Sequence, residues 1–240
     1  MAFERLHDFR DLGGCRTSDG RTLRWGRPFR SDPLGGLRGD DGDRFPALGI
    51  GTVIDPRHPW EVERGGRVHH HPGLAHHHLS IEDRPYEQAG LDPGADPAPF
   101  PAERNSEAAR ERAAGIRGAR EVIAGSAAPL AFHCHSGEDR VGVPPMPVLT
   151  LAGVGAGDIA ADYALTGRAA ERLVAQWRAG HPDLALGWAA YGTAPAETVH
   201  LFTADPERRY GSVRASAADH LGADDDPVAP LRTAPAPLLP

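Results

Sequence analysis

Residues 132–142 hold the side chains of this chain that are best suited to chemistry on a phosphate ester. Cys134 and Arg140 stand six positions apart, with Gly137 between them and Gly142 after them. Apolar residues lead into the segment and follow it, which predicts a strand, a tight loop and a helix. In such a loop, inward-pointing backbone N–H groups and the helix N-terminus attract an anion. The same potential lowers the pKa of a cysteine thiol and yields a thiolate nucleophile.

Each group in this segment has a role in phosphoryl transfer that follows from its chemistry. Cys134 is expected to attack phosphorus and to form a phospho-cysteine intermediate. The planar guanidinium of Arg140 can bind two phosphate oxygens at once. Backbone N–H groups of the loop stabilise the charge that develops on the oxygens. The predicted phosphate-binding residues are His135, Ser136, Gly137, Glu138, Val141 and Gly142.

His-Cys-x5-Arg with a trailing glycine resembles the signature of cysteine-dependent phosphatases. Four other segments resemble, in the same order, the bacterial tyrosine phosphatase family that includes secreted mycobacterial phosphatases with lipid and protein activity. The resemblance implies a cysteine-dependent phosphatase fold that needs no metal and no other cofactor. The four segments are FRDLGG at 9–14 with FRS at 29–31, GTVIDPR at 51–57, IAADYAL at 159–165 and YGSV at 210–213.

The predicted loop departs from the family pattern at two positions. Glu138 stands where the family carries a lysine, and Val141 stands where it carries a hydroxyl side chain. All 26 basic residues of the chain are arginine, so any replacement for that lysine is an arginine. These departures, together with Pro144, Pro145 and Pro147 at the start of the following helix, leave open a second hypothesis, a pseudophosphatase that binds phosphate or vanadate without turnover.

Two aspartates compete for the role of the general acid that protonates the leaving oxygen. The resemblance favours Asp139, which could otherwise serve only as a negative charge at a helix N-terminus. Asp83 is the alternative, because related enzymes with this chemistry carry the acid on a separate loop.

Three further residues are candidate supporting groups. Asp55 follows a predicted buried strand, so it either holds Arg140 or a water in position or is simply a polar strand end. Arg57 stands two residues further on. His133 directly precedes the nucleophile and is expected to shape the loop through hydrogen bonds more than to transfer protons.

Six histidines fall within ten positions, at 69–71 and 76–78. Imidazole suits zinc, copper and nickel, and His69 and His71 would share one face of a strand. Runs of three histidines lack the distinct spacing of a structural zinc site, so we expect an exposed cluster without a metal. A metalloprotein that uses these histidines is the third hypothesis, and its activity would be lost to a chelator and independent of Cys134.

The pattern of apolar residues predicts the elements that must position these groups. Strands are expected at 50–54 and 130–133, and helices at 40–49, 106–124 and 158–179. Residues 84–104 are rich in proline, glycine and aspartate and predict a flexible loop, while 222–240 predict a frayed tail. The whole chain, 1–240, is expected to form one α/β domain with a central, mostly parallel sheet flanked by helices.

Composition limits the partners and the location of the protein. A net charge of −7 argues against general binding to nucleic acid or to a membrane surface. Two cysteines do not make a disulfide framework, so Cys15 is expected to be structural or to pair with Cys134 only on oxidation. Neither a signal segment nor a membrane span is evident, which predicts a cytoplasmic protein, although unconventional export leaves no trace in a sequence. The expected partner is a phosphorylated protein or phospholipid substrate, and no oligomeric state is specified.

Overall fold

The structure is a computed structural model that describes residues 3–81, 91–111, 113–134, 145–211, 215 and 228–233. The described residues form a five-stranded sheet in the order β1-β2-β5-β3-β4. β1 pairs antiparallel with β2, and every other pair in this sheet is parallel. The predicted α/β class and mostly parallel sheet are therefore confirmed. The strands are β1 (Arg10–Asp11), β2 (Pro28–Ser31), β3 (Thr52–Asp55), β4 (Ala75–His78) and β5 (Leu130–His133).

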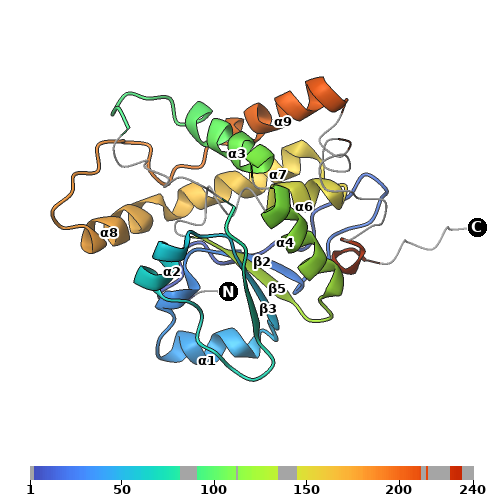
Figure 1. The fold of residues 1–240 in the computed structure, drawn as a ribbon, viewed down its shortest axis with the longest axis horizontal. Coiled ribbons are helices and arrows are strands. Elements are labelled where there is room, and N and C mark those ends of the chain that lie inside the picture. Colours follow the sequence, from blue (N-terminus) through green and yellow to red (C-terminus); the bar gives the residue numbers. More distant parts are fainter. Residues whose placement is uncertain are drawn as a thin grey trace, which may run out of the picture.

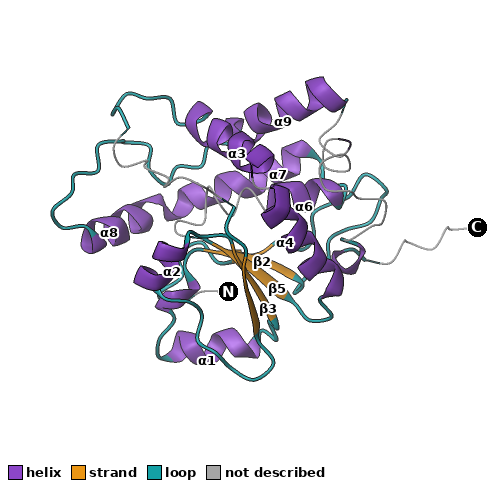
Figure 2. Cartoon of the chain, in the orientation of Figure 1, coloured by secondary structure: helices purple, strands orange, loops and turns teal. Residues whose placement is uncertain are grey.

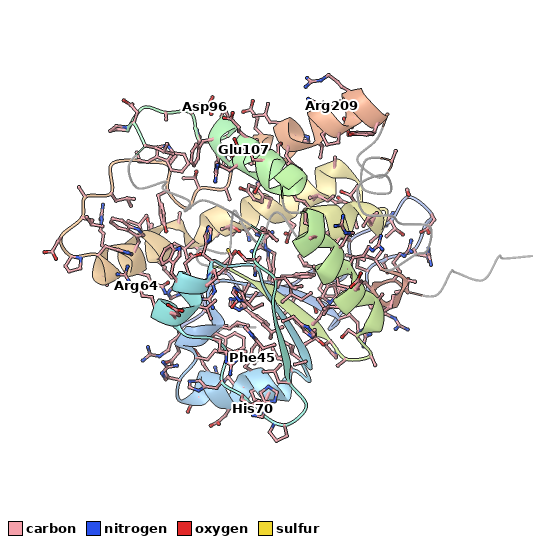
Figure 3. The ribbon with its side chains drawn as sticks, in the orientation of Figure 1. Phe45, Arg64, His70, Asp96, Glu107 and Arg209 are labelled. Carbon is pink, nitrogen blue, oxygen red and sulfur yellow. The ribbon has the colours of Figure 1, made fainter. Side chains whose placement is uncertain are left out.

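Helices cover both faces of the sheet, so its inner strands are buried on both sides (Figures 1 and 2). α1 (Asp40–Ala47) covers one face and corresponds to the helix predicted at 40–49. Its Phe45 packs with Phe29 and Val53 in one core cluster, and Figure 3 shows Phe45 between α1 and the strands.

The second face of the sheet carries the larger core. Ile54 and Phe132 point into it, because successive strand residues alternate between the two faces. The helices that supply its other side chains include α4 (Ala113–Gly125), α6 (Pro145–Leu151) and α7 (Ala156–Ala164).

Other helical elements extend the fold around these two layers. Within the described part of the chain, none of the helices is both long enough and apolar enough to cross a membrane. These elements are η1 (Leu34–Gly36), α2 (Pro59–Gly65), α3 (Pro99–Glu111), η3 (Leu165–Ala169), α8 (Ala170–Gly180), α9 (Glu197–Tyr210) and η4 (Ala229–Leu231).

The prediction of a flexible loop over 84–104 is wrong for its last residues, because α3 begins at Pro99. Two prolines occupy the first turn of α3, where backbone N–H groups have no intrahelical partner and proline is accommodated. The preceding turn is held in place as well. The Asp96 carboxylate accepts a backbone N–H two residues on at 3.0 Å, and the Ala95 carbonyl accepts the Nε1–H of Trp188 at 3.1 Å.

The long helix predicted over 158–179 is divided into α7, the 3-10 turn η3 and α8. At this turn the backbone of η3 lies directly against another segment of the chain, which leaves no room for a side chain at Gly167. A Cβ on Gly167 would lie 2.7 Å from the Thr193 carbonyl oxygen, and the Thr166 hydroxyl donates to the Asp8 carboxylate at 2.8 Å. Tertiary contacts therefore interrupt a pattern that is helical along the sequence.

The prediction of a frayed tail over 222–240 is wrong for residues 228–233, which dock on the fold. Val228 and Leu231 are buried in the larger core. The backbone N–H of Thr233 donates to the Thr22 carbonyl at 2.8 Å. The proline-rich composition of this segment favours disorder, but the burial of two apolar side chains and the backbone hydrogen bond keep it ordered.

Candidate active site

The carboxyl ends of β2, β5, β3 and β4 meet at one edge of the sheet. In this register Ser31 stands beside His133, and Asp55 stands beside His78. Cys134 directly follows β5, the middle strand, and only 1% of it is exposed. The predicted nucleophile therefore lies at the edge where open α/β sheets bind their ligands.

The other predicted loop residues lie outside the described residues, and so do both candidate acids. These are His135, Ser136, Gly137, Glu138, Asp139, Arg140, Val141 and Gly142, together with Asp83.

Arg30, which the sequence pattern did not single out, is in electrostatic contact with Cys134. It lies on β2, the neighbour of β5, and is 2% exposed. Burial alone would lower the pKa of its guanidinium, but the negative charges of Asp162, Asp8 and Cys134 outweigh that effect and raise it. The interaction is mutual, so the same guanidinium favours the thiolate form of Cys134.

A chain of buried charges fixes the position of Arg30. The Asp162 carboxylate on α7 accepts Nη1–H of Arg30 at 2.8 Å and Nε–H of Arg10 at 2.7 Å. Arg10 also pairs with Asp8, whose carboxylate accepts the Thr166 hydroxyl at 2.8 Å. Burial alone would raise the pKa of Asp162, but Arg30 and Arg10 lower it, so Asp162 stays ionised. The two arginines and two aspartates thus form one largely buried ionic network, which includes the arginine that interacts with Cys134.

Asp55 and Arg57 form a second buried ion pair at the same edge. Arg57 donates from Nε to Oδ1 at 2.9 Å and from Nη2 to Oδ2 at 2.8 Å. Burial raises the pKa of Asp55, but hydrogen bonds from Arg57 and His76 outweigh it and hold the pKa well below its usual range. Both predicted supporting residues are therefore buried, and Arg57 binds Asp55 directly. The predicted contact of Asp55 with Arg140 lies outside the described residues.

His133 lies fully buried beside Asp55, with Nε2 3.5 Å from the carboxylate oxygen Oδ2. Burial lowers the pKa of His133 to about 4, and the charges of Arg57 and His76 act in the same direction while Asp55 opposes them. The imidazole is therefore neutral at neutral pH.

The prediction of an exposed histidine cluster holds for only part of it. His69 and His70 are exposed, and Figure 3 shows His70 at the end of the molecule that carries α1. β4 instead turns His76 towards Asp55, with Nε2 3.2 Å from Oδ2, and leaves 12% of its side chain exposed. His78, two residues on, is exposed, and its Nε2 lies 2.7 Å from the Arg57 carbonyl oxygen. His76 was predicted to be exposed, but the pairing of β4 with β3 places its side chain next to Asp55.

Cys15 is a free thiol that packs, half-buried, against the core cluster containing Cys134. Burial and the negative charges of Asp162 and Asp158 raise its pKa to about 11. At neutral pH Cys15 is therefore protonated and poorly nucleophilic.

Comparison with known proteins identifies the family of this chain. The model of the tyrosine phosphatase family matches residues 1–234. A protein of Cupriavidus necator, named as a candidate tyrosine-protein phosphatase, is 30% identical over 180 residues. The match covers 68% of this chain and 61% of that relative's length. The chain belongs to the tyrosine phosphatase family.

Proposed function

We propose that the protein is a phosphomonoester hydrolase of the protein-tyrosine-phosphatase class that acts through a phospho-cysteine intermediate. The observation that carries this proposal is the position of Cys134, buried at the carboxyl end of the middle strand, where it interacts electrostatically with Arg30. The substrate is a phosphorylated protein or a phospholipid.

In the first half-reaction the Cys134 thiolate attacks phosphorus, so the S–P bond forms as the bond to the leaving oxygen breaks. Arg140 and the loop N–H groups bind the equatorial oxygens. Asp139, or Asp83 in its place, gives its proton to the leaving oxygen. Before attack, the positive charge of Arg30 favours the thiolate form of Cys134, and the hydrogen bond to Asp162 holds the Arg30 guanidinium in position.

In the second half-reaction the same carboxylate, now ionised, takes a proton from water as the water oxygen attacks phosphorus. The S–P bond breaks, inorganic phosphate leaves and the Cys134 thiolate is restored. Nucleophile, cation and proton carrier are all side chains, so the cycle requires no metal ion.

Hydrolysis of a generic aryl phosphate tests this function. We expect turnover that vanadate inhibits and that EDTA leaves unchanged, because the loop supplies its own nucleophile and its own cation. Binding of vanadate without turnover would instead support the pseudophosphatase. Strict dependence on added zinc or nickel would move the chemistry to the histidines and contradict the proposal.

The departures at Glu138 and Val141 are expected to restrain turnover. Two unit charges about 6 Å apart at an effective dielectric near 20 repel by roughly 3 kcal/mol before screening, so Glu138→Lys should lower KM severalfold. A hydrogen bond to a charged group contributes about 1.5–3 kcal/mol, so Val141→Thr should raise kcat about tenfold by stabilising the departing thiolate.

Steady-state kinetics of both variants measure these effects, with Glu63→Lys as the control for a charge change on an exposed helix. Glu63→Lys should behave like wild type. Slower hydrolysis by both loop variants would show that the loop is adapted to a different substrate.

A further inference from the structure

We propose that Asp55, His76 and His133 form a binding site for a zinc-type transition-metal dication. The three residues come from three adjacent parallel strands and meet at the carboxyl edge of the sheet. Metal binding at these residues does not require phosphatase activity.

The ligand atoms already converge. Nε2 of His76 lies 3.2 Å, and Nε2 of His133 3.5 Å, from the same oxygen, Oδ2 of Asp55. One ligand atom from each residue lies within 4.8 Å of the other two. In a tetrahedral zinc site with bonds of 2.0–2.1 Å, neighbouring ligand atoms stand about 3.4 Å apart. Two of the three separations therefore match a zinc site, and a small rotation of the partly exposed His76 ring can adjust the third.

The donor set has the chemistry of a zinc site that keeps one position open. Two imidazoles and one carboxylate form the protein ligands of several such sites, and the fourth position takes water or another ligand.

His133 is the residue that gains most from a metal ion. It is fully buried, and beyond an interaction with the Cys134 backbone its ring nitrogens have no hydrogen-bond partner of normal geometry among the residues that the structure describes. A buried polar group without a partner costs free energy, and coordination would supply the missing interaction.

Arg57 orients the carboxylate from the opposite side. It donates three hydrogen bonds to Asp55, from its backbone N–H, Nε and Nη2. An ionised carboxylate offers about four acceptor positions, and a metal would take the one that His76 occupies now, in exchange for that hydrogen bond. Such outer-shell hydrogen bonds fix a ligand's orientation, while the positive charge of Arg57 makes the site weaker than a purely anionic one.

The matched pair of variants is His76→Ala and His77→Ala. Both residues lie on β4, but successive strand side chains point to opposite faces, so only His76 meets Asp55. Asp55 and His133 are poor test positions, because each is fully buried and its replacement could unfold the chain.

Titration of tag-free protein with Zn²⁺ and Co²⁺ tests the site. We expect the wild type and His77→Ala to bind one ion per chain and to show the visible absorption of tetrahedral Co²⁺. His76→Ala should bind at least tenfold more weakly. Equal affinity in His76→Ala and the wild type, or no stoichiometric binding by the wild type, would overturn the proposal.

His76→Cys keeps the proposal testable if His76→Ala fails to fold. A thiolate is also a zinc ligand, so this variant should bind Co²⁺ and add a sulfur-to-metal charge-transfer band in the near ultraviolet. Binding of Co²⁺ without that band would place the ion elsewhere and contradict the assignment.

Discussion

Replacing Cys134 with serine is expected to lower hydrolysis of an aryl phosphate by roughly a thousandfold or more, the scale seen when a covalent nucleophile is removed. A serine hydroxyl does not ionise near neutral pH, so the variant has no anionic nucleophile at this position even with Arg30 nearby. The variant should still bind inorganic phosphate or vanadate, because Arg140 and the loop N–H groups remain.

Cys15→Ser is the matched control for this variant. Its thiol pKa of about 11 keeps Cys15 protonated, so its loss should leave kcat nearly unchanged. Phosphate binding by Cys134→Ser distinguishes a lost nucleophile from a lost fold. Retention of a substantial part of the activity by Cys134→Ser, or its loss in Cys15→Ser, would rule out Cys134 as the sole nucleophile.

Asp162→Asn is expected to lower the free energy of unfolding by about 3–5 kcal/mol, the cost of removing one partner from a buried ion pair. The amide has nearly the same shape as the carboxylate but takes away the counter-charge that Arg10 and Arg30 share. Denaturant unfolding measures this change. Activity should fall as well, because Arg30 loses the contact that holds it near Cys134.

Asp158→Asn tests whether the effect belongs to the buried network. Asp158 lies one turn earlier on the same helix and is exposed, so its replacement should change the free energy of unfolding by less than about 0.5 kcal/mol. Similar destabilisation by both variants would mean that a general charge effect on α7, not the network, is being measured.

Local patterns predicted the elements that carry the nucleophile. The apolar run before Cys134 gave the middle strand at the predicted residues, 130–133, because a buried strand is encoded by its own sequence. The strand predicted at 50–54 was found for the same reason, but β3 begins two residues later and ends one residue later, at Asp55. Both groups stand at the carboxyl edge because parallel strands share that edge.

Long-range pairing accounts for what the sequence did not reveal. Arg30 and Asp162 are 132 residues apart, and nothing local indicates that α7 packs against β2. Arg10, Arg30 and Asp162 all lie in segments that resemble the family, but that resemblance assigned no role to these three residues. His76 likewise lies in the site because of the register in which β4 pairs with β3. In a run of three histidines, the alternation of side chains along a strand does not tell which histidine faces the site.

Context also overrode composition in two segments. The prolines before and within the start of α3 indicated a loop, yet they suit a first helical turn that follows the Asp96 turn. The proline-rich end of the chain indicated disorder, yet Val228 and Leu231 find apolar partners in the core. For the chain end, the deciding contacts come from residues far away in the sequence.

Trapping the intermediate tests the central claim most directly. Wild-type protein is mixed with an aryl phosphate, quenched in denaturant during turnover, digested and analysed by mass spectrometry. The account predicts one added phosphoryl group on the peptide that contains Cys134, and none on that peptide from Cys134→Ser. Turnover with the phosphoryl group on a histidine or an aspartate, or with no labelled peptide under conditions that preserve a phosphorylated thiol, would contradict it.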